Sequence, residues 1–191
     1  LPAAIAPVVV ATALAYKVHG VNWINALLAL IVGIAMQVGV NYSNDYSDGI
    51  KGTDSNRVGP MRLVGSGAAS ASQVKRAALL TYFIGACAGL ILALRTSILL
   101  TIVGAIAIVA AWTYTGSSKP YGYRGFGEIS VFVFFGIVAT NGTFYAETKH
   151  FSGWAFLLSL TMGALACALL AINNLRDLPK DLSLIHISEP T

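Results

Sequence analysis

Apolar residues run through this chain in long stretches that contain no Asp, Glu, Lys or Arg. Six such windows cover residues 1–16, 18–44, 77–94, 96–118, 129–146 and 150–175. Each is close to or above the roughly 17–25 residues with which an α-helix crosses a hydrocarbon core, the first being slightly short. The windows lack the apolar–polar alternation of a transmembrane β-barrel. The pattern therefore predicts six transmembrane helices, with Pro2 and Pro7 in the first half of the first one.

The composition agrees with an all-α integral membrane protein. Of 191 residues, 56% are hydrophobic and only 10% are charged, whereas a soluble domain carries about 25% charged residues. This excludes most soluble enzymes, disordered chains and small secreted scaffolds. The net charge of +4 comes from scattered residues and not from a basic run, so nucleic-acid binding is not indicated. Cys87 and Cys167 lie inside apolar windows without metal-ligand spacing and read as packing residues.

The basic residues are distributed unevenly over the two ends of the predicted helices. Nine follow the second, fourth and sixth windows, namely Lys51, Arg57, Arg62, Lys75, Arg76, Lys119, Arg124, Arg176 and Lys180. Three lie on the opposite side, namely Lys17, Arg95 and Lys149. Cytoplasmic loops carry the excess of Lys and Arg. The asymmetry predicts a multi-pass protein of the inner (plasma) membrane, with its N-terminus and the ends of its even-numbered helices in the cytoplasm.

A first acidic motif closes the second window, at residues 41–48 (NYSNDYSD). If the helix continues through residue 48, Asn41, Asp45 and Asp48 stand at positions i, i+4 and i+7 and share one face. Asp54 follows six residues later. All of these acids fall on the predicted cytoplasmic side, where orientation rules alone do not require carboxylates.

A second, similar motif closes the sixth window. Asn173 and Asn174 are followed by Asp177, which shares a helix face with Asn173, and by Asp181. Pro179 is expected to end the helix, which would place Asp181 on a loop. The two motifs lie four helices apart, which suggests an internal repeat of a four-helix unit.

Carboxylates gathered at a membrane surface repel one another unless a cation lies between them. Their hard oxygen atoms suit Mg²⁺, which is typically held by a few carboxylates together with substrate phosphates. The alternative is that these residues are ordinary solvated helix ends. That reading suffices for one motif, whereas two matched motifs on the same side favour a magnesium site that binds a diphosphate.

Two loops on the predicted cytoplasmic side add cations and exposed backbone N–H groups. The first contains residues 59–67 (GPMRLVGSG) and, with Lys51, Arg57 and Arg62, could neutralise a phosphate. Arg57 is equally explained as an ordinary positive charge of a cytoplasmic loop. The second covers residues 114–128 (YTGSSKPYGYRGFGE). There Lys119 could bind a diphosphate or a substrate carboxylate, while the tyrosines either line a pocket that tolerates a cation or form an interfacial belt.

Three motifs in this order, NDYSD at 44–48, KPYGYRG at 119–125 and NNLRD at 173–177, resemble the UbiA superfamily of intramembrane prenyltransferases. Within it they are most similar to the branch that prenylates 1,4-dihydroxy-2-naphthoate in menaquinone biosynthesis. The resemblance covers residues 1–181. It implies a fragment, with six helices, of a bundle that normally has about eight or nine transmembrane helices around a central cavity.

The resemblance also implies roles for individual residues. Asp45, Asp48, Asp177 and Asp181 would hold Mg²⁺ and, with Lys119, take part in ionising a polyprenyl diphosphate. The wide gap between Asp48 and Asp54 points to the naphthoate branch. Tyr42, Tyr46 and Tyr114 would offer π-faces to the allylic cation. The expected substrate-binding residues are Asn41, Asn44, Lys51, Arg57, Arg62, Tyr114, Arg124, Asn173 and Asn174.

The implied reaction transfers the prenyl group to 1,4-dihydroxy-2-naphthoate with loss of diphosphate and CO₂. Another aromatic acceptor, of the 4-hydroxybenzoate or homogentisate type, remains an alternative. A membrane transporter is a more distant one, because its polar residues would be needed at mid-membrane and these acids lie at helix ends. The motif of CDP-alcohol phosphotransferases, which combines Asp-Gly and Ala-Arg elements, is not found.

The last ten residues, 182–191 (LSLIHISEPT), resemble the translation of a transposon-end sequencing adapter. We therefore expect residues 1–181 to form part of a prenyltransferase domain and residues 182–191 not to be native. We expect the chain to be a fragment cut at both ends. Because the family fold would need two or three further helices to enclose its cavity, the 191-residue chain is expected to be inactive by itself.

Overall fold

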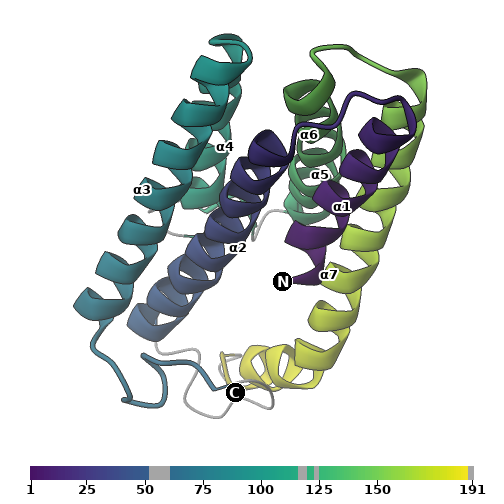
Figure 1. The fold of residues 1–191 in the computed structure, drawn as a ribbon. Helices are drawn as coiled ribbons and strands as arrows, with labels where there is room; N and C mark the ends of the chain where they lie inside the picture. Colours follow the sequence, from purple (N-terminus) through teal and green to yellow (C-terminus); the bar gives the residue numbers. More distant parts are fainter. Residues whose placement is uncertain (52–60, 116–119, 123–124, 189–191) are drawn as a thin grey trace.

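The computed structural model describes residues 1–51, 61–115, 120–122 and 125–188, and for residues 176–188 it describes the backbone alone. Within these ranges the chain forms helices and their connections and no strand. The helices are α1 (Pro2–Lys17), α2 (Trp23–Lys51), α3 (Ala71–Arg95), α4 (Leu99–Thr115), α5 (Gly127–Val131), the π-helical segment η2 (Phe132–Val138), α6 (Ala139–Thr148) and α7 (Gly153–Ser188). They run alongside one another as a bundle (Figure 1).

The six predicted helices are confirmed, because α5, η2 and α6 follow one another without a break as a single segment. By length and composition, four segments could cross a membrane, namely Trp23–Lys51, Ala71–Arg95, Gly127–Thr148 and Gly153–Leu175. Two further apolar helices, Pro2–Lys17 and Leu99–Thr115, are shorter. Large apolar side chains cover the outside of the bundle: Leu94 is 71% exposed and Trp154 is 70% exposed. Such a surface is stable in lipid and unfavourable in water, so the fold is that of a multi-pass membrane protein.

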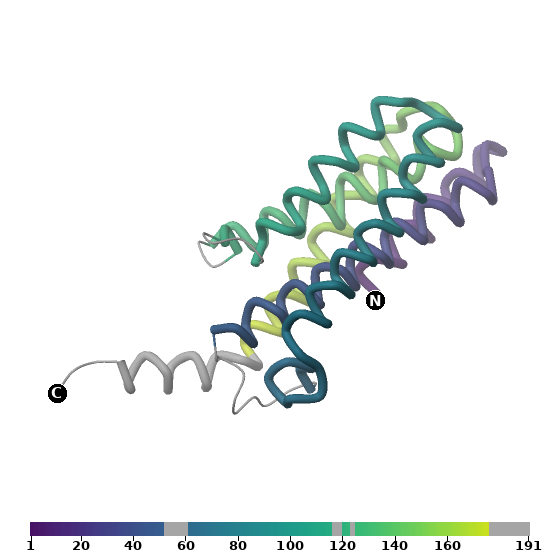
Figure 2. The backbone as a smooth tube through the Cα atoms, turned by 90° about the vertical axis from the view of Figure 1, so that its left-hand side faces the viewer, coloured from purple at the N-terminus to yellow at the C-terminus, as the bar shows by residue number. Residues whose placement is uncertain are grey.

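The connections between the helices lie at the two ends of the bundle as the charge pattern predicts. The α1–α2, α3–α4 and α6–α7 connections lie together at one end of the bundle, at the top of Figure 1. Lys17, Arg95 and Lys149 belong to this end, because each closes or directly follows the helix before one of these connections. The α2–α3 connection lies at the other end, as the side view in Figure 2 also shows.

The helices α2 and α3 approach closely because a glycine on each of them faces the other helix, opposite a tyrosine ring in one place and an alanine in the other. A Cβ atom on Gly39 would lie 2.5 Å from the ring of Tyr82, and one on Gly85 would lie 3.3 Å from the Cβ of Ala35. The Tyr82 hydroxyl then reaches the Ser43 hydroxyl at 3.0 Å. This contact fixes α2 against α3 directly beside the first acidic motif.

A second close crossing joins η2 to α7. A Cβ atom on Gly136 would lie 2.5 Å from the Cα atom of Gly163, and one on Gly163 would lie 2.7 Å from the ring of Phe132. At Gly136 a side chain would push the two backbones apart, whereas at Gly163 it would collide with the Phe132 ring. The crossing places the middle of α7, from Ala166 to Asn174, against the interior space that α2 also faces.

The helix α7 is longer than predicted, and the expectation that Pro179 ends it is wrong. The helix continues to Ser188, so Asp181 lies on the helix and not on a loop. Proline removes a single backbone N–H from the hydrogen-bonding pattern, and a helix can continue beyond it with a local distortion. That residues 182–191 are not native stays a prediction. The side chains of this segment lie outside the described residues.

Polar contacts hold the bundle together at the end opposite the acidic motifs. The Asn25 amide donates to the carbonyl of Ala146 at 2.6 Å, and Arg95 Nε donates to the Asn25 carbonyl at 2.8 Å. The Thr12 hydroxyl donates to the buried carboxylate of Glu147 at 2.6 Å. These bonds tie α1, α2, α3 and α6 to one another at this end of the bundle.

Candidate functional site

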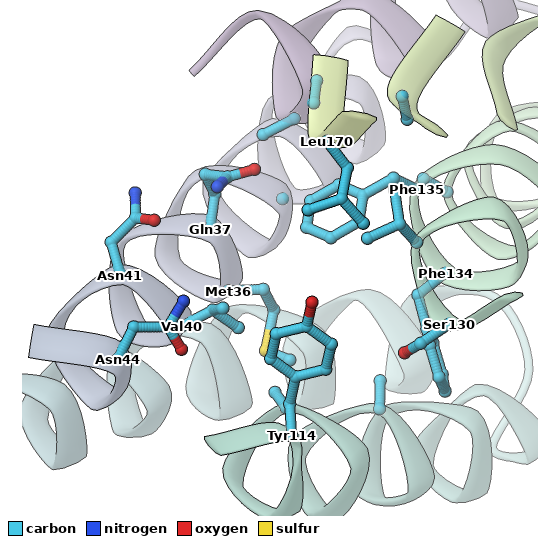
Figure 3. A pocket seen from close by; sticks show the side chains of 18 of the residues that line it. Met36, Gln37, Val40, Asn41, Asn44, Tyr114, Ser130, Phe134, Phe135 and Leu170 are labelled. Atoms are coloured by element: carbon cyan, nitrogen blue, oxygen red, sulfur yellow. The ribbon is translucent and has the colours of Figure 1, made fainter. Parts of the chain in front are cut away.

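A cavity of about 1430 Å³ lies between α2, α4, η2 and α7 and extends to α1 and α6. Its wall changes character along the bundle. Near the end of α2 it is polar, with Asn41, Asn44, Asp45 and Asp48, whereas deeper parts are formed by apolar residues such as Phe134. Figure 3 shows this interior with side chains of α2, α4, α5, η2 and α7 around it. The cavity can hold a charged group at its mouth and a hydrocarbon chain below it.

Asp45 lies at the mouth and is 5% exposed. Its two carboxylate oxygens accept hydrogen bonds from the backbone N–H groups of Leu63, at 2.8 Å, and Val64, at 3.1 Å. Val64 in turn packs on Gly49, where a Cβ atom would lie only 2.3 Å from the valine side chain. The glycine-containing loop after α2 therefore folds back onto the motif, and Asp45 holds it there.

Asp48 lies one turn further along α2 and is paired with Arg62. One guanidinium nitrogen is 3.5 Å from the Asp48 carboxylate, with the side chains 19% and 20% exposed. The other nitrogen donates a long bond, 3.4 Å, to the backbone carbonyl of Asn41. Arg62 thus bridges the motif at the mouth. Lys51 lines the same cavity from the last turn of α2.

The end of α4 is attached to the first motif. The Thr115 hydroxyl donates to the Asn44 side-chain carbonyl, and the Ser47 hydroxyl donates to the backbone carbonyl of Thr115 at 2.8 Å. Asn44 therefore has a structural partner as well as a place in the cavity wall. These bonds fix the position of the adjacent Tyr114.

Tyr114 projects into the cavity, and its hydroxyl points to the interior in Figure 3. Its ring meets that of Tyr121 edge to face, with 5.5 Å between the centroids and 82° between the planes. Two glycines make room for it: a Cβ atom would lie 3.1 Å from the ring at Gly122 and 3.1 Å from the hydroxyl oxygen at Gly127. The ring is thus held rigidly, with its polar atom available.

The second motif reaches the same cavity through Asn173 and Asn174, which line it opposite α2. Asp177 and Asp181 follow on α7, but their side chains lie outside the described residues. Lys119, Arg57, Arg124 and Asp54 also lie outside them. The predicted convergence of two motifs therefore rests, in the described part, on the asparagines.

The predicted tyrosines separate into two groups. Tyr42 and Tyr114 line the cavity. Tyr46 does not, and its ring lies under the ammonium group of Lys75, 5.5 Å from the centroid. Because Tyr46 follows Asp45 directly, it points about 100° away around the helix. The expectation that Tyr46 faces a cation in the cavity is therefore wrong.

The donor atoms at the mouth suit a magnesium ion. They are carboxylate oxygens of Asp45 and Asp48 and side-chain oxygens of asparagines, and Mg²⁺ prefers such ligands. Each Asp45 oxygen accepts one hydrogen bond and keeps a lone pair. Among the residues whose side chains are described, no three His, Cys, Asp or Glu side chains form a complete metal site. The fit is thus that of an ion which completes its coordination with water and substrate oxygens.

Sequence reasoning missed several residues of the cavity wall. Glu128 and Ser130 line it near the start of α5, and Phe134 and Phe135 line it from η2. Gln37 lines it one turn below Asn41. A signal for Gln37 was present, because it is the one polar side chain between residues 26 and 40 and stands four residues before Asn41.

Comparison with known proteins identifies the family of this chain. Residues 4–188 match the UbiA prenyltransferase family. The chain belongs to that family. It is 54% identical over 181 residues to a protein of Mycobacterium tuberculosis named 1,4-dihydroxy-2-naphthoate octaprenyltransferase. It is 39% identical over 188 residues to a protein of the same name from Escherichia coli, and 27% identical over 187 residues to one from Bacillus subtilis.

These alignments cover 95% of this chain but only 62%, 61% and 58% of the three relatives, respectively. The chain thus spans about three fifths of the length of the curated relatives that it matches. No solved structure matches it at comparable significance.

Proposed function

We propose that the complete protein containing this chain transfers a polyprenyl group from polyprenyl diphosphate to 1,4-dihydroxy-2-naphthoate, giving the hydroquinone form of demethylmenaquinone. The observation that carries the proposal is a cavity with a carboxylate- and cation-lined mouth and an apolar interior, inside a bundle of membrane helices. A lipid with a diphosphate head needs both environments. The names of the relatives indicate the acceptor.

In the proposed reaction the C–O bond between the allylic carbon and the diphosphate breaks, and the electron pair leaves with the diphosphate. The carboxylate-bearing carbon of the acceptor ring then forms a bond to the allylic carbon. Loss of CO₂ returns the electron pair of the C–C bond to the ring, which restores its aromaticity. The products are the prenylated ring, CO₂ and diphosphate, so no oxidant or reductant is required.

The residues at the mouth would bind the diphosphate in three ways, through a metal ion, through cationic side chains and through amides. Asp45 and Asp48, with Asp177 and Asp181 of the second motif, would hold Mg²⁺, which neutralises the departing diphosphate. Lys51 and Arg62 would bind its remaining charge, joined by Lys119, Arg57 and Arg124. Asn41, Asn44, Asn173 and Asn174 would offer amide donors and acceptors around the same group.

Tyr114 and Tyr42 would stabilise the allylic cation. Their π-faces favour a neighbouring positive charge, as the allylic carbon acquires when the diphosphate leaves. The apolar wall below them excludes water, which would otherwise capture that carbon. We place this mouth on the cytoplasmic face of the plasma membrane, because nine of the twelve Lys and Arg residues follow the second, fourth and sixth charge-free windows.

The test uses membranes that contain the complete protein, octaprenyl diphosphate, Mg²⁺ and 1,4-dihydroxy-2-naphthoate labelled in its carboxyl group. We expect the hydroquinone form of demethylmenaquinone and labelled CO₂ in equal amounts, and neither product when EDTA removes the metal. A parallel reaction with 4-hydroxybenzoate is the control for acceptor identity. Efficient use of 4-hydroxybenzoate with no product from the naphthoate would contradict the proposal, as would turnover that is unaffected by EDTA.

A further inference from the structure

Gln37 is a polar side chain in an otherwise apolar part of a membrane helix. Every other residue from 26 to 40 is apolar or glycine, and the segment lies in the span Trp23–Lys51. An amide in such surroundings is unfavourable unless it finds a hydrogen-bonding partner, and polar groups inside membrane spans usually belong to functional sites. In the part of the chain whose side chains are described, no residue forms a hydrogen bond with the Gln37 amide.

The position of Gln37 suggests where its partner would lie. The residue lines the cavity, and Figure 3 shows its amide on the α2 wall, with Phe135 and Leu170 across the cavity. These neighbours are apolar and cannot satisfy an amide. The Tyr114 hydroxyl points into the same space, and the described residues offer it no hydrogen-bond partner either. Gln37 and Tyr114 therefore face a mostly apolar chamber, in which the Ser130 hydroxyl already pairs with the Tyr121 hydroxyl at 2.8 Å.

The distance along α2 separates this chamber from the diphosphate site. Gln37 precedes Asp45 by eight residues, which corresponds to about 12 Å at the helical rise of 1.5 Å per residue. The diphosphate is drawn to the mouth by the metal and by Lys51 and Arg62. The polyprenyl chain has no polar atom that could bind an amide. Of the proposed reactants, the aromatic acceptor alone carries substituents that would satisfy Gln37 and a flat ring that fits between apolar walls.

We infer that Gln37 is a specificity-determining residue that binds the polar ring substituents of the aromatic acceptor. Its amide N–H groups would donate to the carboxylate of the acceptor, and its carbonyl would accept from a ring hydroxyl. The Tyr114 hydroxyl would contact the same ring from α4. The inference rests on the proposed function, since it names the residue that recognises the acceptor.

The experiment compares the complete protein with its Gln37→Met variant, which keeps the size of the side chain and removes its amide. We expect the KM for 1,4-dihydroxy-2-naphthoate to rise about tenfold, as loss of a hydrogen bond to a charged group would cause. The KM for octaprenyl diphosphate should change by less than about twofold, because the donor does not contact this amide. The matched control is Leu27→Met on the same helix, whose side chain is 57% exposed on the outside of the bundle and does not line the cavity, so both constants should stay near their original values.

A second variant keeps the test decisive if the first is not recovered from membranes. Gln37→Glu preserves the shape but places a carboxylate opposite that of the acceptor, so acceptor binding should fall more than donor binding. An unchanged acceptor KM in either variant, or equal increases for acceptor and donor, would overturn the inference. Failure of the proposed function is a separate result: the unmodified complete protein would then not prenylate the naphthoate at all.

Discussion

Replacing Asp45 by Asn should release the loop that follows α2. The aspartate is buried, and its two oxygens accept the N–H groups of Leu63 and Val64. Asparagine offers one oxygen, so one N–H would instead face an NH₂ group and lose its acceptor. A hydrogen bond to a charged group contributes about 1.5–3 kcal/mol, and an unpaired buried N–H costs about 1–3 kcal/mol. We expect the loop to lose about 3 kcal/mol of local stability.

Asp48→Asn is the matched control, because it makes the same chemical change one turn away. Asp48 is one fifth exposed and its ion pair with Arg62 spans 3.5 Å. The Leu63 and Val64 N–H groups bond to Asp45, so Asp48→Asn should leave both of these hydrogen bonds in place. If both residues hold the metal, both variants lose Mg²⁺-dependent turnover, but Asp45→Asn alone frees the loop. The two roles of the motif can therefore be separated by measuring structure and activity in the same variants.

Hydrogen exchange of the complete protein in detergent micelles measures this difference directly. About 3 kcal/mol corresponds to a rise of about a hundredfold in the exchange rate of the Leu63 and Val64 amides. Asp48→Asn should raise the same rates by less than about fivefold. Equal rates in the two variants, or unchanged protection in Asp45→Asn, would refute the view that Asp45 is the anchor of this loop.

Three further outcomes can be checked independently. A cysteine placed beside Lys149 should react with an impermeant reagent added outside the cell, and one beside Lys51 should not; the reverse pattern would invert the topology. Asp177→Asn in the complete protein should abolish Mg²⁺-dependent product formation while the amount in the membrane stays constant, and normal activity would remove this residue from the metal site. Gly136→Leu should lower the thermal stability strongly, because a Cβ at this position has no room against α7. Gly104→Leu should be tolerated, because nothing lies within 4 Å of a Cβ there. Equal losses of stability in the two variants would contradict the packing described.

The helices could be predicted from the sequence because lipid imposes a simple requirement. A segment without charges must be long enough to cross the bilayer, and the six charge-free windows correspond to the six helical segments. The boundaries were less predictable: α2 continues through its polar motif to Lys51, and α7 continues past Pro179. Charge composition marks where a helix leaves the membrane, and the backbone can remain helical beyond that point.

The site was predictable where it depended on local spacing and not where it depended on tertiary contacts. Helical periodicity correctly placed Asn41, Asp45 and Asp48 together on the cavity wall. It could not show that Asp45 binds the backbone of Leu63, because that contact joins residues 18 apart through a loop. Nor could it show which apolar residues of η2 face the cavity, since an apolar window has no polar side to orient it.

The π-helical segment η2 keeps one stripe of side chains directed at the cavity over several turns. The lining residues of this segment and its neighbours recur every four positions, as Ser130, Phe134, Val138 and Gly142, and as Val131, Phe135, Ala139 and Thr143. In an ordinary α-helix each four-residue step overshoots a full turn by about 40°, so three steps would turn the stripe by about 120°. The wider turns of η2 absorb this excess. The number of residues in η2 thus determines how far along the cavity this stripe of side chains continues. Deleting one residue from η2 would rotate the side chains of α6 away from the cavity.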